Sequence, residues 1–178
     1  MPGVTIDEVQ GLIDPLKSYQ FLMNISPIRG QNHIGNDVLS LRCTATSLPG
    51  STISPIGVDL GGFTLHYAGR RQFGGTWSTS IIEGQDMGVM LQISSWMKLI
   101  YDQTSGVGSF KADYEAIATI EMYDDPNSVI GVRTLYGVWP QADPGTPLSM
   151  AGGGSRIDYG ITWSYDYWDD DANASQGF

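Results

Sequence analysis

The stretch that decides the fold runs from Ile157 to Trp168 and reads Ile-Asp-Tyr-Gly-Ile-Thr-Trp-Ser-Tyr-Asp-Tyr-Trp. At the two-residue period of a β-strand, its bulky side chains point one way and its small or polar ones point the other way. The bulky set is Ile157, Tyr159, Ile161, Trp163, Tyr165 and Tyr167, and the opposite set is Asp158, Gly160, Thr162, Ser164 and Asp166. A slip of one residue would expose the whole aromatic set to solvent. We therefore expect one strand of fixed register, with one face buried and the other exposed to water.

Further strands are predicted at 18–25, 38–47, 63–68, 76–82, 111–123 and 129–139. The segment 69–75, which has glycine at both ends, indicates a hairpin between 63–68 and 76–82, and 124–128 predicts a turn between the last two strands. The longest strand, 111–123, carries Lys111, Asp113, Glu115, Thr119 and Glu121 on the face opposite its alanines. We expect the strands to be mainly antiparallel.

One helix interrupts these strands. From Asp86 onward the apolar residues follow a helical period, with Val89, Ile93, Trp96 and Ile100 on one stripe, and Asp86 is placed to cap the helix. Segments 26–37, 51–62 and 140–154 are rich in glycine and proline and predict long loops. The expected fold class is mainly β, an antiparallel β-sandwich or partly closed barrel with one flanking α-helix and long loops.

The length of 178 residues favours a single domain over 1–178, with 1–17 as an N-terminal arm and 169–178 as an acidic C-terminal tail. A formal net charge of -10 argues against a protein that binds nucleic acid through its phosphates. The acidic surface could also serve solubility alone. The lone Cys43 and the isolated His33 and His66 predict no internal disulfide, no zinc site and no cofactor. With no signal-peptide pattern and no long apolar run, we expect cytoplasmic synthesis and no membrane insertion.

Catalytic motifs are not apparent, and we expect no enzyme. Glu115 with Glu121 or Asp158 could formally supply the carboxylate pair of a glycosidase. Acidic residues that alternate along a strand are more typical of a solvated face. The run 169–171 could hold a cation weakly, but it is more typical of a solvated tail.

Five stretches in a fixed order give the chain a family resemblance. They are Leu41-Arg42-Cys43-Thr44-Ala45-Thr46-Ser47-Leu48-Pro49-Gly50, Ala68-Gly69-Arg70-Arg71-Gln72-Phe73 followed by Trp77, Ser95-Trp96-Met97, Val138-Trp139-Pro140, and Ser164-Tyr165-Asp166-Tyr167-Trp168. Their order and spacing over residues 19–168 resemble the tail-tube proteins of contractile-tailed bacteriophages.

The resemblance implies a β-barrel or sandwich flanked by a helix, six copies of which close into a ring. Rings stack into a tube that conducts viral DNA from the capsid to the host cell. The implied partners are further copies of the chain, a sheath protein, a baseplate hub or initiator and a tail terminator. A tape-measure protein and double-stranded DNA would occupy the lumen without specific binding. The implied location is the virion tail, assembled in the host cytoplasm.

Within that family the inner wall is built by strands from all six subunits, and the polar strand faces are our candidates for it. One candidate channel-lining set is Asp113, Glu115, Thr119 and Glu121, and a second is Asp158, Thr162 and Asp166. An acidic bore would let a duplex slide, because DNA carries about one negative charge per 1.7 Å of axis. The same carboxylates could instead face the outer solvent. The three long loops are expected to join stacked rings.

Two alternatives stay open at this level. A tube subunit of a phage-derived contractile injection system, which carries no DNA, would have nearly the same sequence. A carbohydrate-binding or carbohydrate-hydrolysing β-sandwich would use Glu115 or Glu121. Rings in electron micrographs, about 80 to 100 Å wide for six domains of this size, would favour a tube.

Overall fold

The computed structural model describes residues 15–26, 28, 37–143, 145–146, 148–150 and 156–171. In chain order the elements are β1 (Phe21–Ile25), α2 (Asp37–Leu41), β2 (Cys43–Thr46), β3 (Ser51–Leu60), β4 (Phe63–Phe73), β5 (Thr76–Ile82), α3 (Gly88–Ile100), β6 (Tyr101–Asp102), β7 (Val107–Gly108), α4 (Lys111–Tyr114), β8 (Ala116–Tyr123), β9 (Val129–Ala142), β10 (Asp158–Ser164) and β11 (Tyr167–Asp171). No helix in the described part of the chain is both long and apolar enough to cross a membrane.

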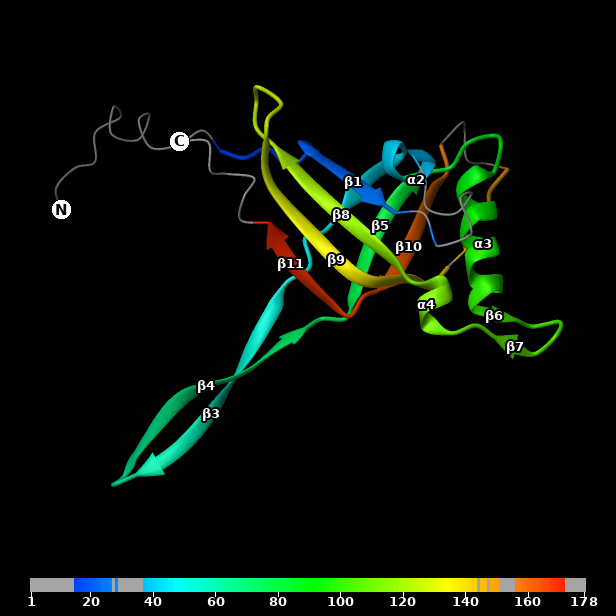
Figure 1. The fold of residues 1–178 in the computed structure, drawn as a ribbon. Helices are drawn as coiled ribbons and strands as arrows, with labels where there is room; N and C mark the ends of the chain where they lie inside the picture. Colours follow the sequence, from blue (N-terminus) through cyan, green and yellow to red (C-terminus); the bar gives the residue numbers. More distant parts are fainter. Residues whose placement is uncertain are drawn as a thin grey trace.

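Two antiparallel sheets share the long strand β9 (Figure 1). Along one edge β9 pairs with β8, which in turn pairs with β1. Along the other edge the first part of β9 pairs with β11, and its end pairs with β10. The order β1-β8-β9-β11 therefore forms one sheet, and β9-β10-β5-β2 forms the other. The predicted fold class is confirmed, as is the predicted pairing of β8 with β9 across the turn at 124–128.

The stretch 157–168 is two strands, and the prediction of one continuous strand is wrong. Up to Tyr165 the predicted alternation holds, since Tyr159, Ile161, Trp163 and Tyr165 are all buried. At Asp166 the chain leaves β5 and continues along β9 from its end to its first part, where the Asp166 N–H donates to the carbonyl of Tyr136.

This change of partner reverses the alternation beyond Asp166. Tyr167 is 48% exposed, whereas Trp168 is buried. In β10 the odd-numbered residues face the core, whereas in β11 the even-numbered Trp168 does. A single two-residue period cannot describe both strands.

Three tryptophans from three elements occupy the centre of the core. The ring of Trp163 lies 5.9 Å from that of Trp77 and 5.5 Å from that of Trp96. The Trp163 indole N–H donates to the Thr79 hydroxyl at 2.9 Å, so its only polar atom is satisfied inside the core. Helix α3 contributes Val89, Ile93 and Trp96 to this core, which confirms the predicted helical stripe.

The helix cap differs from the prediction. Met87 occupies the N-cap position with φ 52° and makes no side-chain cap hydrogen bond. The carboxylate of Asp86 binds Arg42 instead. The cap comes from Glu83, whose carboxylate accepts from the N–H groups of Val89 at 3.2 Å and Met90 at 2.7 Å. Glu83 thereby satisfies two N–H groups of the first turn that have no partner within the helix.

Removing this carboxylate should weaken α3 measurably. We expect Glu83→Ala to lower the free energy of unfolding by about 1–2 kcal/mol, since a typical N-cap loss costs that much. Asp86→Ala should cost less, because that carboxylate is 58% exposed and its main partner is Arg42 in an ion pair at the surface. Chemical denaturation of the two variants under identical conditions measures the difference. Equal losses would show that Glu83 is not the cap.

Two further strand predictions need correction. Residues 37–41 form α2 instead of the first half of a strand at 38–47, because five residues are too few for either period to stand out. Residues 111–114 form α4, and only 116–123 of the predicted strand is extended. The carbonyl of Tyr114 accepts the indole N–H of Trp96 at 2.8 Å, which anchors α4 against α3.

The predicted loops and tails are also partly revised. Residues 140–142, expected to start a loop, end β9, and the structure describes only 143, 145–146 and 148–150 of the rest. The predicted loop 26–37 lies mostly outside the described residues. Residues 169–171 belong to β11 instead of a free acidic tail, and 172–178 lie outside the described part. The N-terminal arm 1–17 is described only from residue 15.

Candidate assembly surfaces

The most prominent surface is a long two-stranded ribbon that projects from the two sheets (Figure 1). It consists of β3 and β4, paired from Ser51↔Phe73 to Leu60↔Phe63, and we call it the arm. The sequence predicted a loop at 51–62 and a hairpin between 63–68 and 76–82, and both predictions are wrong. Residues 69–73 continue β4, and β5 pairs with β2 and β10 instead.

One face of the outer part of the arm is apolar. Three successive cross-strand pairs lie on it, namely Ile56↔Tyr67, Val58↔Leu65 and Leu60↔Phe63. Their exposed fractions run from 37% for Val58 to 77% for Phe63. The opposite face is polar near the tip, where the Thr64 hydroxyl donates to Asp59 at 2.6 Å. Such a contiguous exposed apolar surface, opposed by a polar one, marks a site of protein contact.

A signal for the arm was present in the sequence. Gly61 and Gly62 connect the two strands with φ 60° and 86°, the left-handed values that a two-residue hairpin turn requires. Alternating apolar residues stand on both sides of this pair. Pro55 and Gly57 concealed the pattern, because both residue types are normally scarce inside strands.

A second surface is the outer face of sheet β1-β8-β9-β11. Ala118 and Ile120 of β8 point into the core, so Thr119 and Glu121 point outward. Thr119 is the centre of a polar row across all four strands, formed by Asn24, Thr119, Thr134 and Asp169 in neighbouring register positions. Glu121 accepts a hydrogen bond from the hydroxyl of Tyr123. We call this surface the polar sheet face. It contains Thr119 and Glu121, which the sequence analysis proposed, together with Asn24, Thr134 and Asp169, which it did not.

The remaining predicted channel residues lie outside β8. Asp113 is on α4, and Glu115 ends that helix and lines a surface hollow with Ile117 of β8, Tyr136 of β9 and Tyr167 of β11. Asp166 lies between β10 and β11 and forms an ion pair with Lys111. This pairing raises the pKa of the Lys111 ammonium through its hydrogen bond to Asp166.

The second candidate set is divided between two places. Asp158 and Thr162 are both on β10, in the sheet that does not contain β8. Asp158 is paired with Arg156 at 3.1 Å. The structure therefore brings Thr119 and Glu121 together on one sheet face. Glu115 and Asp166 line one surface hollow with residues of β8, β9 and β11 of the same sheet, whereas Asp113, Asp158 and Thr162 lie on other elements.

A glycosidase pair does not fit this arrangement. Glu115 and Glu121 are separated by six positions along an extended strand, about 20 Å at 3.3 Å per residue. Paired glycosidase carboxylates lie about 5–9.5 Å apart. Within the described residues, no group of three or more histidine, cysteine, aspartate or glutamate residues could hold a metal ion.

The sheet that carries the polar face also has two open edges. In the described chain, β1 pairs only with β8, and β11 pairs only with β9. Open strand edges offer unpaired backbone groups to another chain. The polar sheet face could thus be continued sideways by further copies, a feature that the sequence alone did not indicate.

A sequence model described as phage tail tube protein matches residues 15–170, which is most of the chain and includes the arm, both sheets and α3. The chain belongs to the phage tail tube protein family. It is accordingly a tail tube subunit, a component of the tail of a virion or of an injection system. The family consists of structural tube proteins. Among curated proteins, no sequence matches this tail tube chain.

Solved structures share the fold at low sequence identity. A chain of the anti-feeding prophage baseplate has 16% identity and a TM-score of 0.62, with 90% of the tail tube chain and 97% of the other covered. A chain of an extracellular contractile injection system, from its sheath-tube complex in the extended state, has 12% identity and a TM-score of 0.62, with 95% and 99% covered. A chain of the sheath/tube terminator of that kind of system has 13% identity and a TM-score of 0.64, with 91% and 100% covered.

Proposed function

We propose that this chain forms six-membered rings that stack into a tail tube through which viral DNA passes from the capsid to the host cell. The observation that carries this proposal is the arm, whose apolar face has no partner in the described chain and extends beyond the sheets that form the core. A second copy of the chain is the occupant that the family requires. A contact between unlike surfaces of identical copies closes into a ring where the rotation between copies completes a circle, and it continues as a filament where it does not. A contact through the arm that displaces each copy along the tube axis is of the second kind.

The open edges of sheet β1-β8-β9-β11 supply the ring. If β1 of one copy pairs with β11 of the next, six copies would give a closed barrel of about 24 strands, with a circumference of about 115 Å at 4.8 Å per strand. Barrels of more than about 16 strands leave an aqueous channel. In this arrangement the polar sheet face, with Thr119, Glu121 and Asp169, would line the bore.

An acidic bore would suit DNA passage because it offers the duplex no cations to bind. Of the residues proposed from sequence, Thr119 and Glu121 stay candidates for the lining. For Asp113, Asp158 and Thr162 a role at the bore would require that α4 and β10 also reach it. Glu115 and Asp166 line a surface hollow with residues of β8, β9 and β11, so they also stay candidates. A sheath protein outside the tube, a baseplate hub or initiator, a tail terminator and a tape-measure protein inside are the partners we propose, with assembly in the host cytoplasm.

Negative-stain electron microscopy of the purified protein tests the proposal. We expect rings about 80 to 100 Å wide, an estimate from domain size, and tubes built from them. A chain that stays a single subunit at high concentration, with or without baseplate components, would contradict it.

The alternative is a tube of a contractile injection particle without DNA. It is favoured by the fold similarity to chains from such systems. Nuclease treatment of particles purified from the producing host separates the two. Protected double-stranded DNA in intact particles indicates a virion, whereas empty particles indicate an injection system.

A lysine at the centre of the polar row should turn the bore into a DNA-binding surface. Thr119→Lys would add six cations per ring, and we expect tubes of this variant to retain DNA at low salt and to release it steeply as salt rises. Wild-type tubes should retain none. The control is Ser95→Lys on the exposed side of α3, which adds the same charge away from the polar row. A DNA gel-shift of assembled tubes gives the readout. Equal DNA retention by both variants would show that Thr119 does not line the bore.

A further inference from the structure

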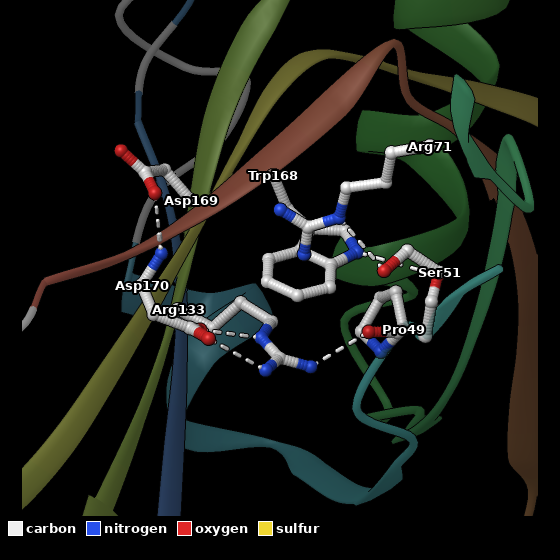
Figure 2. Close-up of polar contacts among 8 residues, drawn as sticks. Pro49, Ser51, Arg71, Arg133, Trp168, Asp169 and Asp170 are labelled. Carbon is white, nitrogen blue, oxygen red and sulfur yellow. Dashed lines mark hydrogen bonds and ion pairs between the residues drawn. The ribbon is translucent and has the colours of Figure 1, made fainter. Parts of the chain in front are cut away.

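The root of the arm is joined to sheet β1-β8-β9-β11 by a compact cluster of side chains (Figure 2). The chain enters β3 through Pro49 and Gly50 and leaves β4 at Phe73. From the sheet side, β9 contributes Arg133 and β11 contributes Trp168 and Asp170. The cluster therefore joins four strands, the two of the arm with β9 and β11, which come from three separate regions of the sequence.

Trp168 is the centre of the cluster. Its indole ring has the guanidinium carbon of Arg133 at 3.7 Å from the ring centroid and that of Arg71 at 4.4 Å. The ring of Phe73 meets it edge-on at 5.7 Å. Trp168 is buried and the Arg133 side chain is 18% exposed, so the cation–π contact between them is largely shielded from water, which strengthens it. Arg71 covers the ring from the exposed side of the cluster.

Hydrogen bonds attach the cluster to the backbone at the root. Arg133 donates to both carboxylate oxygens of Asp170 at 2.7 and 2.9 Å, and its remaining nitrogen donates to the carbonyl of Pro49 at 2.7 Å. The indole N–H of Trp168 donates to the carbonyl of Gly50 at 3.3 Å. These bonds hold the backbone where β3 begins.

The other strand of the arm is held as well. Arg71 of β4 donates from Nε to the hydroxyl of Ser51 at 2.9 Å while its guanidinium lies against Trp168. A two-stranded ribbon fixed at a single point could pivot about that point. Contacts to both strands, made by planar groups with fixed geometry, remove that freedom.

We propose that Arg71, Arg133 and Trp168 form a clamp that fixes the angle between the arm and sheet β1-β8-β9-β11, so that the arm is already in its docking orientation before it meets the next ring. The inference rests on the proposed function for the docking step, while the fixed angle is a property of one subunit. These three are positioning residues. The apolar face at Val58 and Leu65 makes the contact itself.

Distances between two spin labels test the fixed angle. In a Cys43→Ser background, His66→Cys labels the polar face of the arm and Lys98→Cys labels the exposed side of α3. Labelled chains are mixed with a large excess of unlabelled chains, so that distances within one subunit are recorded whether or not tubes form. The test variants are Arg71→Met and the pair Arg71→Met with Arg133→Met. The control is Arg70→Met, which removes the same charge from a neighbouring exposed arginine.

We expect a narrow distance distribution in the parent and in Arg70→Met, and at least a twofold broader one in the clamp variants. If the arm then occupies its docking orientation for about a tenth of the time, the critical concentration for tube growth rises about tenfold. Circular dichroism and the melting temperature report whether the core is intact, and Arg71→Met, which alters only the arm side, is the variant least able to disturb it.

An unchanged distribution in the clamp variants would overturn the inference. A broad distribution with an unchanged critical concentration would overturn its second half, the role in docking. If the parent shows a narrow distribution but never forms tubes, the proposed function fails while the clamp stands. The two failures are therefore distinguishable.

Discussion

Replacing Val58 by lysine together with Leu65 by glutamate should give a folded subunit that no longer grows tubes. The two residues are Cα partners on the apolar face of the arm, at 37% and 44% exposure. Opposite charges placed directly across from each other support strand pairing, so the arm should persist. Docking loses the burial of the exposed part of two aliphatic side chains, about 0.5–1.3 kcal/mol each, since less than half of each is exposed in the subunit. The critical concentration should rise about tenfold or more, because each tenfold change corresponds to about 1.4 kcal/mol and the two new charges would also lose water on docking.

A matched control introduces the same two charges at a polar position of the same arm. Thr52→Lys with Gln72→Glu alters another cross-strand pair, near the root, and both residues are exposed. Light scattering against protein concentration gives the critical concentration for each variant, and electron microscopy confirms tubes or their absence. Normal tubes from the Val58 and Leu65 variant would contradict docking through the apolar face. Loss of tubes in the control alone would place the contact on the polar side.

Trp163→Ala should produce the largest loss of stability in the chain. The side chain is fully buried, lies against two other tryptophans and donates to Thr79, which is itself buried. Truncating a buried tryptophan costs about 3–5 kcal/mol. In a chain of this size each kcal/mol lowers the melting temperature by about 2–4 °C, so we expect a fall of about 6–20 °C.

Tyr167→Ala provides the comparison for this substitution. Tyr167 is 48% exposed and stacks on Tyr136 with a centroid separation of 4.7 Å. Such a pair is worth about 0.5–1.5 kcal/mol, and the loss should be correspondingly small. Thermal unfolding followed by circular dichroism measures both. A Trp163→Ala variant that melts within 2–4 °C, about one kcal/mol, of the parent would mean that the three tryptophans are not the centre of the core.

The sequence was sufficient where one periodicity held over a whole element. The inward side chains of β10, the buried stripe of α3 and the pairing of β8 with β9 all followed from regular alternation of apolar residues. Each of these elements packs one face on the common core. In such elements the burial of one face in the core determines both the periodicity of apolar residues in the sequence and the secondary structure.

The prediction failed where the chain changes its partner or its environment. At Asp166 the chain loses its pairing with β5 and continues along β9, and at Tyr114 the carbonyl that ends a short helical turn accepts from a tryptophan on another helix. Both depend on contacts between residues far apart in sequence. The arm was missed because it buries no face within its own subunit, whereas strand prediction assumes that apolar alternation serves the core of the same chain.

The candidate site was predicted only in part for the same reason. Thr119 and Glu121 were placed correctly on the outer face of a strand, since β8 keeps its alternation there. Asn24, Thr134 and Asp169 complete the polar row through register with three other strands, and register between distant strands is not encoded in any one of them. A local pattern can specify which face of a strand is polar, but not which strands lie beside it.

Strand β9 has one more consequence. Because it is a member of both sheets, the wall that we propose for the bore and the second layer behind it are joined by continuous polypeptide as well as by side-chain contact. A pull along the tube that strained the inner layer would be transmitted through covalent bonds to the outer one. The two layers are therefore built to resist being sheared apart when the particle is under mechanical load.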